Sequence, residues 1–175
     1  MHPVCLLTGS PGVGKTSLII EATTSAARKT GGFYTREIRE HGRRVGFEIV
    51  TLGGERGMLA HVNLRGLHRV GKYVVDVDNI DKVGVSALNK AVQENEVVVV
   101  DEIGRMELFS TAFQQTVLDV LDSGKYVLGT IMRTSHPWAD RIKQRPEVQI
   151  IELTRGNWNK VLERVVGWLG GGILG

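Results

Sequence analysis

The chain has 175 residues, of which 42% are hydrophobic, and its 22 basic and 19 acidic residues give a formal net charge of +3. This length is enough for one α/β core and too short for two, so we expect a single domain over residues 1–175. The mild positive charge suits an anionic ligand but falls short of a nucleic-acid footprint, and no apolar run approaches the roughly 20 residues that cross a bilayer.

The first predicted elements are a strand and a helix joined by a glycine-rich loop. The apolar run at 4–7 predicts a buried strand, and the segment 15–29 predicts a helix. Between them, residues 9–16 form a complete G-x-x-x-x-G-K-[ST] phosphate-binding loop. In this motif backbone N–H groups surround the phosphates, the lysine reaches the β and γ oxygens, and the final hydroxyl binds Mg²⁺. We therefore predict nucleotide contacts from Gly9, Ser10, Pro11, Gly12, Val13, Gly14, Lys15, Thr16 and Ser17, and a metal contact from Thr16.

A β-rich insert is predicted from about residue 32 to 78, beside the core sheet. Thr30-Gly31-Gly32 predicts a break, and strands at 33–38 and 44–51 flank a polar hairpin tip. A turn at 53–57 and a strand at 73–77 precede a helix at about 82–94. The densest basic group of the insert is interpreted as a solvated loop or a rim near the triphosphate, in preference to a nucleic-acid site; it comprises His61, Arg65, His68, Arg69 and Lys72.

The four valines at 97–100 predict a buried parallel strand in the middle of the sheet. Ligands of open α/β sheets bind at the carboxyl ends of the strands, so Asp101 is placed to hold Mg²⁺ through a water, together with Thr16. Glu102 comes next and is predicted to orient or deprotonate the water that attacks the γ-phosphorus. This arrangement favours transfer of the phosphoryl group to water, which is hydrolysis, over transfer to another acceptor.

The rest of the chain alternates strands and helices. Strands are predicted at 97–100, 126–131 and 149–153, with helices near 111–121, 138–144 and 158–169. Such alternation predicts a parallel sheet with right-handed crossovers. Together with the phosphate loop, it gives the expected fold class α/β: a P-loop NTPase with a RecA-like, mostly parallel central sheet flanked by helices. Gly170-Gly171-Gly172 ends the last helix, and we expect a loose tail over 170–175.

Two further residues follow the central strands. Arg105 has the charge to stabilise the transition state, although a surface arginine paired with Glu107 or Asp119 is an equal alternative. Thr130 ends a core strand, where its hydroxyl would reach the attacking water or the γ-phosphate; strand threonines are also common without such a role.

The loop after the last strand is a candidate border of the nucleobase. Arg155 has a planar guanidinium that stacks on bases, and Asn157 can touch a base edge. Asn157 equally suits a helix cap, because asparagine is favoured there.

Five segments of the chain resemble the family of cancer-related nucleoside-triphosphatases. They lie at 8–16, 32–39, 46–52, 70–77 and 100–110, and the last, which reads Val-Asp-Glu-Ile-Gly-Arg-Met-Glu-Leu-Phe-Ser, is the most specific. The resemblance runs nearly end to end and implies slow hydrolysis of ATP, GTP and other nucleoside triphosphates. It also implies nucleotide contacts along a second segment: Val97, Val98, Val99, Val100, Asp101, Glu102, Ile103 and Gly104.

The chain departs from the family pattern at three positions. Arg105 stands where lysine is frequent, Met132 where proline is common, and Trp158 where an arginine often follows the asparagine. The first departure conserves charge. The other two lie near the presumed base-binding edge, so they bear on nucleotide preference.

Taken together, these patterns predict a Mg²⁺-dependent nucleoside-triphosphate phosphohydrolase of broad nucleotide range, with Glu102, Lys15 and Arg105 as catalytic residues. A nucleotide or small-molecule kinase and a nucleotide-dependent binding switch stay open as alternatives. The expected ligands are Mg²⁺ and ATP, GTP or another triphosphate, with no nucleic acid or membrane as partner. We also expect a cytoplasmic location; the oligomeric state is open, with a monomer favoured.

Overall fold

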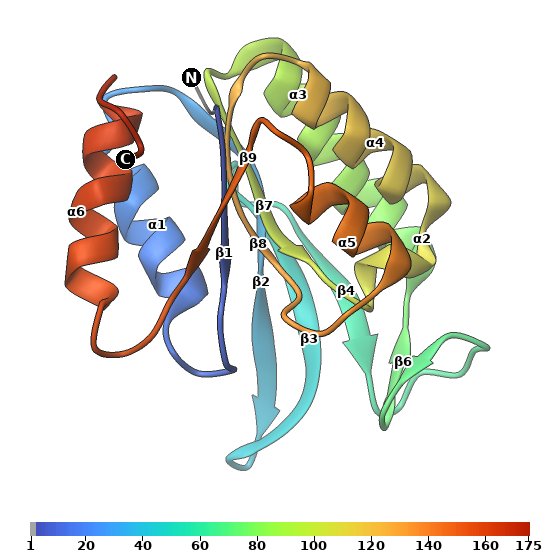
Figure 1. Cartoon of the computed structure of the whole chain (residues 1–175). Coiled ribbons are helices and arrows are strands. Elements are labelled where there is room, and N and C mark those ends of the chain that lie inside the picture. Colours follow the sequence, from blue (N-terminus) through green and yellow to red (C-terminus); the bar gives the residue numbers. More distant parts are fainter. Residues whose placement is uncertain (1–2) are drawn as a thin grey trace.

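The computed structural model describes residues 3–175, which form one nine-stranded mixed sheet with helices on both faces (Figure 1). The strands follow the order β5-β6-β4-β3-β2-β7-β8-β1-β9 across the sheet. Their bounds are β1 Val4–Thr8, β2 Thr30–Glu40, β3 Arg43–Thr51, β4 Arg56–His61, β5 Arg69–Val70, β6 Tyr73–Val75, β7 Val97–Ile103, β8 Tyr126–Ile131 and β9 Val148–Glu152.

The half of the sheet that runs from β9 to β2 is entirely parallel. Strand β1 pairs with β8 and β9, and β7 pairs with β8 and β2, all in parallel register. Counted by themselves, these five strands have the order 5-1-4-3-2. The predicted RecA-like, mostly parallel sheet flanked by helices is confirmed, and β8 lies between the strand that precedes the phosphate loop and the strand that carries Asp101.

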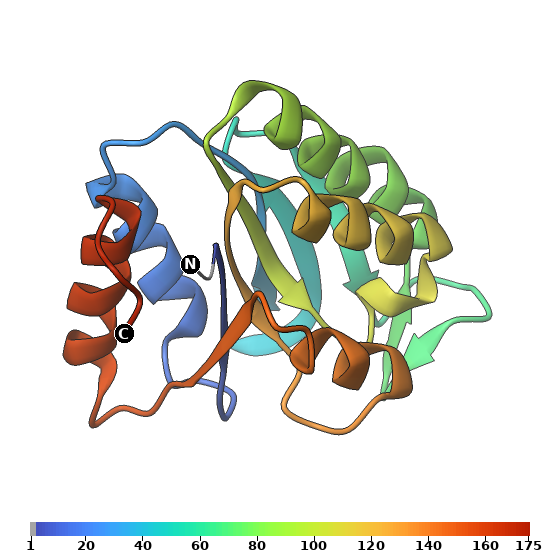
Figure 2. The same cartoon turned by 45° about the horizontal axis from the view of Figure 1, so that its top comes forward.

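Helices cover both faces of this parallel half (Figures 1 and 2). Helices α1 (Lys15–Ser25) and α6 (Trp158–Leu169) lie on one face, and α3 (Ser86–Glu94), α4 (Thr111–Asp122) and α5 (Pro137–Lys143) on the other. The central valines alternate between the two layers, because successive strand side chains point to opposite faces. Val97 and Val99 pack with α1 and α6, whereas Val98 and Val100 pack with the other layer.

Short helical segments connect the sheet to these helices. Helix α2 (Val77–Asn79) continues through a wider π-helical segment (Ile80–Val85) into α3, and a 3-10 turn spans Glu107–Phe109. Within residues 3–175 no helix has the length and apolar character that crossing a membrane requires.

The predicted β-rich insert extends the core sheet instead of lying beside it. Strand β2 pairs in parallel with β7 from Thr30 to Phe33, then continues as one arm of the hairpin with β3. The predicted break at Thr30-Gly31-Gly32 is therefore wrong. At Gly32, with φ of 106°, a Cβ would lie 2.1 Å from the carbonyl oxygen of Val99. Glycine is required there because the two backbones approach too closely for a side chain.

Several other boundaries differ from the predictions. The predictions contain no strand at β4, whose buried residues are consecutive instead of alternating, and the predicted turn at 53–57 covers only its first two residues. The bulge in its pairing with β3, between Phe47 and Glu48, accounts for that pattern. Helix α1 ends at Ser25 instead of 29, and β6 ends at Val75 instead of 77.

The C-terminal tail packs against the protein, contrary to the expected loose segment. Gly172 donates its N–H to the carbonyl of Gly167 at 3.0 Å, which turns the chain back along α6. Leu174 is 5% exposed in the layer of α1 and α6, and its carbonyl accepts a hydrogen bond from Arg164 at 3.3 Å. The glycines that end the helix therefore allow the tail to add a side chain to the core.

Gly32→Ala tests the close approach of β2 and β7. We expect it to lower the free energy of unfolding by about 3 to 5 kcal/mol, through backbone strain and the clash with Val99. Gly42→Ala is the matched control: Gly42 also has a positive φ, 75°, but nothing lies within 4 Å of its Cβ position, so we expect a loss of only about 1 to 2 kcal/mol. Urea denaturation measures both, and equal losses would contradict the steric explanation.

Candidate active site

The phosphate loop connects β1 to α1 at the carboxyl end of the parallel strands. The Lys15 ammonium bends back over this loop and donates hydrogen bonds to the carbonyls of Gly9, at 2.8 Å, and Ser10, at 3.1 Å. Helix α1 begins at Lys15, so its free N-terminal N–H groups face the same concavity. This geometry presents a cation and several backbone donors to an anion.

Three predicted residues meet at one buried carboxylate. Asp101, at 3% exposure, accepts hydrogen bonds from the hydroxyls of Thr16, at 2.5 Å, and Thr130, at 2.6 Å. Burial raises the pKa of Asp101 above its ordinary value, while the two hydrogen bonds and the charge of Lys15 oppose that rise. Thr130 is fully buried, and the structure places its hydroxyl on the carboxylate of Asp101.

The donor set around Asp101 fits Mg²⁺ brought with a nucleotide. The Thr16 hydroxyl directs its proton at Asp101, so the lone pairs of its oxygen are free to bind a cation. Over residues 3–175 no cluster of three His, Cys, Asp or Glu side chains can hold a metal by itself. Mg²⁺ is commonly bound by one or two protein groups plus phosphate oxygens and waters, which is the arrangement that this site permits.

Glu102 lies next to Asp101 and is partly buried. Burial raises its pKa, and the neighbouring charge of Asp101 raises it further, while Lys15 lowers it. Its carboxylate lies against Gly104, where a Cβ would be 2.5 Å from Glu102 Oε1. The glycine of the Glu-Ile-Gly segment therefore provides the space that the Glu102 side chain occupies.

Glu107 is a buried carboxyl that sequence reasoning treated only as a surface partner for Arg105. It is 2% exposed, and its pKa is raised well above the ordinary range by burial and then by the charge of Glu102. Backbone N–H groups of Glu107 itself and Gly104 partly offset this rise. The position of Glu107 inside the apolar run Met-Glu-Leu-Phe is the feature of the sequence that indicates its burial. Arg105 is exposed, and its side chain makes no hydrogen bond or ion pair with residues 3–175, so the alternative that pairs it with Glu107 or Asp119 is not found.

Arg133 contacts the phosphate loop, and sequence reasoning missed this contact. It follows β8, donates a hydrogen bond from Nη1 to the Ser10 hydroxyl at 2.9 Å, and lies 3.4 Å from a carboxylate oxygen of Glu152. No motif marks this arginine, because the contact joins positions that are far apart in the chain. It brings a guanidinium to the phosphate loop, in addition to the Lys15 ammonium.

The segment between β9 and α6 is braced by Asn157. Its side-chain oxygen accepts the N–H of Thr154 at 2.8 Å, and its amide nitrogen donates to the carbonyl of Glu152 at 2.9 Å. Asn157 precedes α6, but its side chain makes no capping hydrogen bond to the helix. Arg155 is exposed on the same segment.

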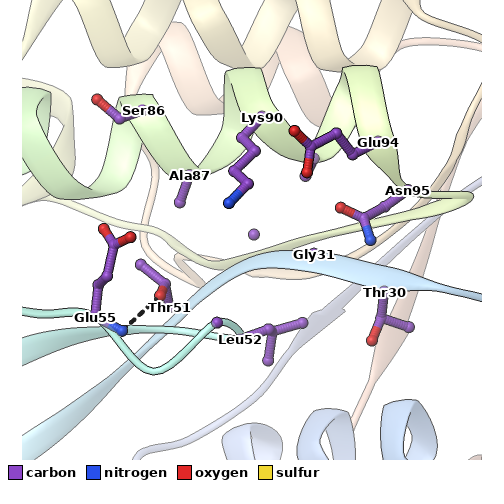
Figure 3. A pocket seen from close by; sticks show the side chains of 13 residues that line it. Thr30, Gly31, Thr51, Leu52, Glu55, Ser86, Ala87, Lys90, Glu94 and Asn95 are labelled. Atoms are coloured by element: carbon purple, nitrogen blue, oxygen red, sulfur yellow. Dashed lines mark hydrogen bonds between the residues drawn. The ribbon is translucent and has the colours of Figure 1, made fainter.

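A cavity of about 340 Å³ lies away from these residues, between α3 and strands β2 and β3 (Figure 3). Its floor is the segment Thr30–Gly32, which pairs with the first half of β7, whereas Asp101 lies in the second half. Lys90 extends into it from α3. The candidate active site is therefore formed by the open phosphate loop and not by this cavity.

Comparison with known proteins identifies the family. A family model described as NTPase matches residues 4–166. The nucleoside-triphosphatase THEP1 of Thermotoga sp. (strain RQ2) is 44% identical over 164 residues, 94% of each chain. The crystal structure of THEP1 from Aquifex aeolicus has a TM-score of 0.86 and 32% identity, covering 95% of this chain and 98% of that one. The solution structure of a human cancer-related nucleoside triphosphatase has a TM-score of 0.80 and 37% identity, covering 97% and 98%. The chain therefore belongs to the family of THEP1 and the cancer-related nucleoside-triphosphatases.

Proposed function

We propose that the protein is a Mg²⁺-dependent nucleoside-triphosphatase that converts ATP, GTP and other triphosphates to the diphosphate and phosphate. The proposal depends on the contact of Thr16 and Thr130 with the buried carboxylate of Asp101, directly beside the phosphate loop. Glu102 follows in the chain, and relatives that carry the nucleoside-triphosphatase name support the activity.

The reaction is in-line attack of water on the γ-phosphorus. The loop N–H groups and the Lys15 ammonium would bind the phosphates, while Thr16 and Asp101 would hold the metal. When bound, Mg²⁺ neutralises charge on the phosphate oxygens. Glu102 accepts a proton from the attacking water. The oxygen of that water bonds to the γ-phosphorus as the bond between the γ-phosphorus and the β–γ bridging oxygen breaks, and the nucleoside diphosphate leaves. The raised pKa of Glu102 suits this step, because it makes the carboxylate a stronger base.

Two arginines are proposed to stabilise the charge that develops on the γ-phosphoryl group. Arg133 is already held on Ser10 of the phosphate loop. Arg105 is exposed and follows Asp101 closely in the chain. Its side chain forms no hydrogen bond or ion pair among residues 3–175 that would compete with a phosphate. Guanidinium groups in such positions contribute to phosphoryl transfer by electrostatic stabilisation.

A broad substrate range follows from what the site recognises. The residues proposed to bind the nucleotide gather at the phosphate loop, and the chain contains no Asn-Lys-x-Asp segment that would read guanine. Arg155 and Asn157 are proposed to border the base. The oxygen and the nitrogen of the Asn157 side-chain amide are both bonded to backbone, so Arg155 supplies a stacking surface that accepts every base.

Glu102→Gln tests the chemical step. We expect phosphate release from ATP, GTP, CTP and UTP to fall by about 10² to 10⁴-fold, the usual loss of a general base. Nucleotide binding should stay within about twofold, since the neutral amide keeps the size of the side chain. Lys15→Ala is the comparison variant and should lose binding itself. Wild-type protein that binds nucleotide, releases no inorganic phosphate, and forms the diphosphate only when a small acceptor is added that becomes phosphorylated would identify a kinase and refute hydrolysis.

Asp101→Asn tests the metal site. We expect the Mg²⁺ concentration for half-maximal activity to rise about 10 to 100-fold, the usual effect of removing a group that orients a metal ligand. The melting temperature should not fall, because the substitution removes a buried charge and keeps partners for both threonines. Titration of activity with Mg²⁺ after treatment with EDTA measures the first effect. An unchanged Mg²⁺ requirement would contradict the assignment.

Glu107→Gln tests the electrostatic cost of the buried carboxyl. Folding raises the pKa of Glu107 above its ordinary value of 4.5. The folded state therefore loses stability as the pH rises from 4.5 through the raised pKa. The neutral amide avoids this loss. We expect the variant to melt higher than wild type at pH 8, by about 2 to 4 °C for each kcal/mol recovered, and to match it near pH 4. A variant that melts lower at pH 8 would contradict this interpretation.

A further inference from the structure

Trp158, the first residue of α6, contacts the last glycine of the phosphate loop. Its indole Nε1 donates a hydrogen bond to the carbonyl of Gly14 at 3.0 Å. The same carbonyl accepts the N–H of Leu18, also at 3.0 Å, as α1 begins. Gly14 has a φ of 93°, and a Cβ on it would lie 2.9 Å from the indole nitrogen. The indole therefore occupies the space that a side chain would take at any other residue.

This contact fixes the direction of the next backbone donor. A trans peptide group is planar, and its C=O and N–H point in opposite directions. Two donors hold the Gly14 oxygen on the side of α1 and α6. The N–H of Lys15, in the same peptide group, therefore points the other way, out of the start of α1 and into the loop. It is one of the free helix N-terminal donors that bind phosphate oxygens.

We infer that Trp158 is a positioning residue for the phosphate loop, whose indole N–H directs the Lys15 amide at a phosphate of the bound nucleotide. The inference deepens the proposed function and rests on it, because the ligand is a nucleoside di- or triphosphate. Trp158 touches no reacting atom. The Lys15 backbone N–H would bind phosphate equally before and during the reaction. Trp158 therefore affects nucleotide affinity more than the rate of the chemical step.

Trp168 on the same helix provides the matched comparison. It is 2% exposed and packs edge-on against Tyr126, with ring centroids 5.2 Å apart. Its indole nitrogen has no hydrogen-bond partner in the described part of the chain. Replacing Trp168 with Phe therefore changes packing on α6 without removing a contact to the loop.

The test compares Trp158→Phe with Trp168→Phe and wild type by titration with ADP and ATP. Phe keeps an aromatic ring but not the N–H, so we expect Trp158→Phe to bind both nucleotides about threefold to tenfold more weakly, the usual effect of losing one hydrogen bond. KM should rise by a similar factor, with kcat within about twofold of wild type. Trp168→Phe should lower the melting temperature without changing either nucleotide affinity.

A spectroscopic measurement does not depend on the folding of Trp158→Phe. The chain has three tryptophans, so Trp138→Phe combined with Trp168→Phe leaves Trp158 as the single emitter. We expect its fluorescence to change when ADP binds. An unchanged emission, or Trp158→Phe that binds ADP as tightly as wild type while melting lower, would overturn the positioning role and leave the hydrolase proposal intact. Wild-type protein that binds no nucleotide would refute both.

Discussion

The buried carboxylate of Asp101 is the point on which the arrangement of the site depends. Its two oxygens accept hydrogen bonds from the hydroxyls of Thr16, at the start of α1, and Thr130, in β8. A buried carboxylate must be satisfied in this way, since an unpaired charge in the interior is costly. One side chain of β7 thereby fixes the distance between the strand that bears it, the neighbouring strand and the helix that follows the phosphate loop. The strand order, with β8 between β1 and β7, makes these contacts possible.

The same constraint makes the site electrostatically unfavourable until a cation binds. Burial raises the pKa of Asp101, Glu102 and Glu107; the charge of Asp101 also raises the pKa of Glu102, and the charges of Glu102 and Asp101 raise that of Glu107. Lys15 opposes the rise at Asp101 and Glu102 only. A ligand that binds the folded state alone stabilises it, and here a metal cation would also relieve this repulsion. Stability and ligand binding are therefore linked through the three carboxyls.

The sequence predicts the parts of the site that depend on local spacing. The phosphate loop, the valine strand and the acidic pair after it lie within short segments whose patterns are specific. The contacts missed are long-range. Arg133 reaches Ser10 across 123 positions, and Trp158 reaches Gly14 across 144. The predicted break at Thr30-Gly31-Gly32 failed for the same reason, because the pairing of β2 with β7 overrides the usual preference of glycine for turns.

The phosphate loop is held at both ends by residues from outside it. Arg133, after β8, bonds the side chain of Ser10 near its start, and Trp158, on α6, bonds the backbone of Gly14 near its end. A loop fixed in this way loses little conformational freedom when it binds, so more of the interaction energy appears as affinity. That energy comes from the phosphates, which all nucleoside triphosphates share. A preorganised loop that binds the common part of the ligand can accept many bases, so the proposed broad specificity is consistent with this arrangement.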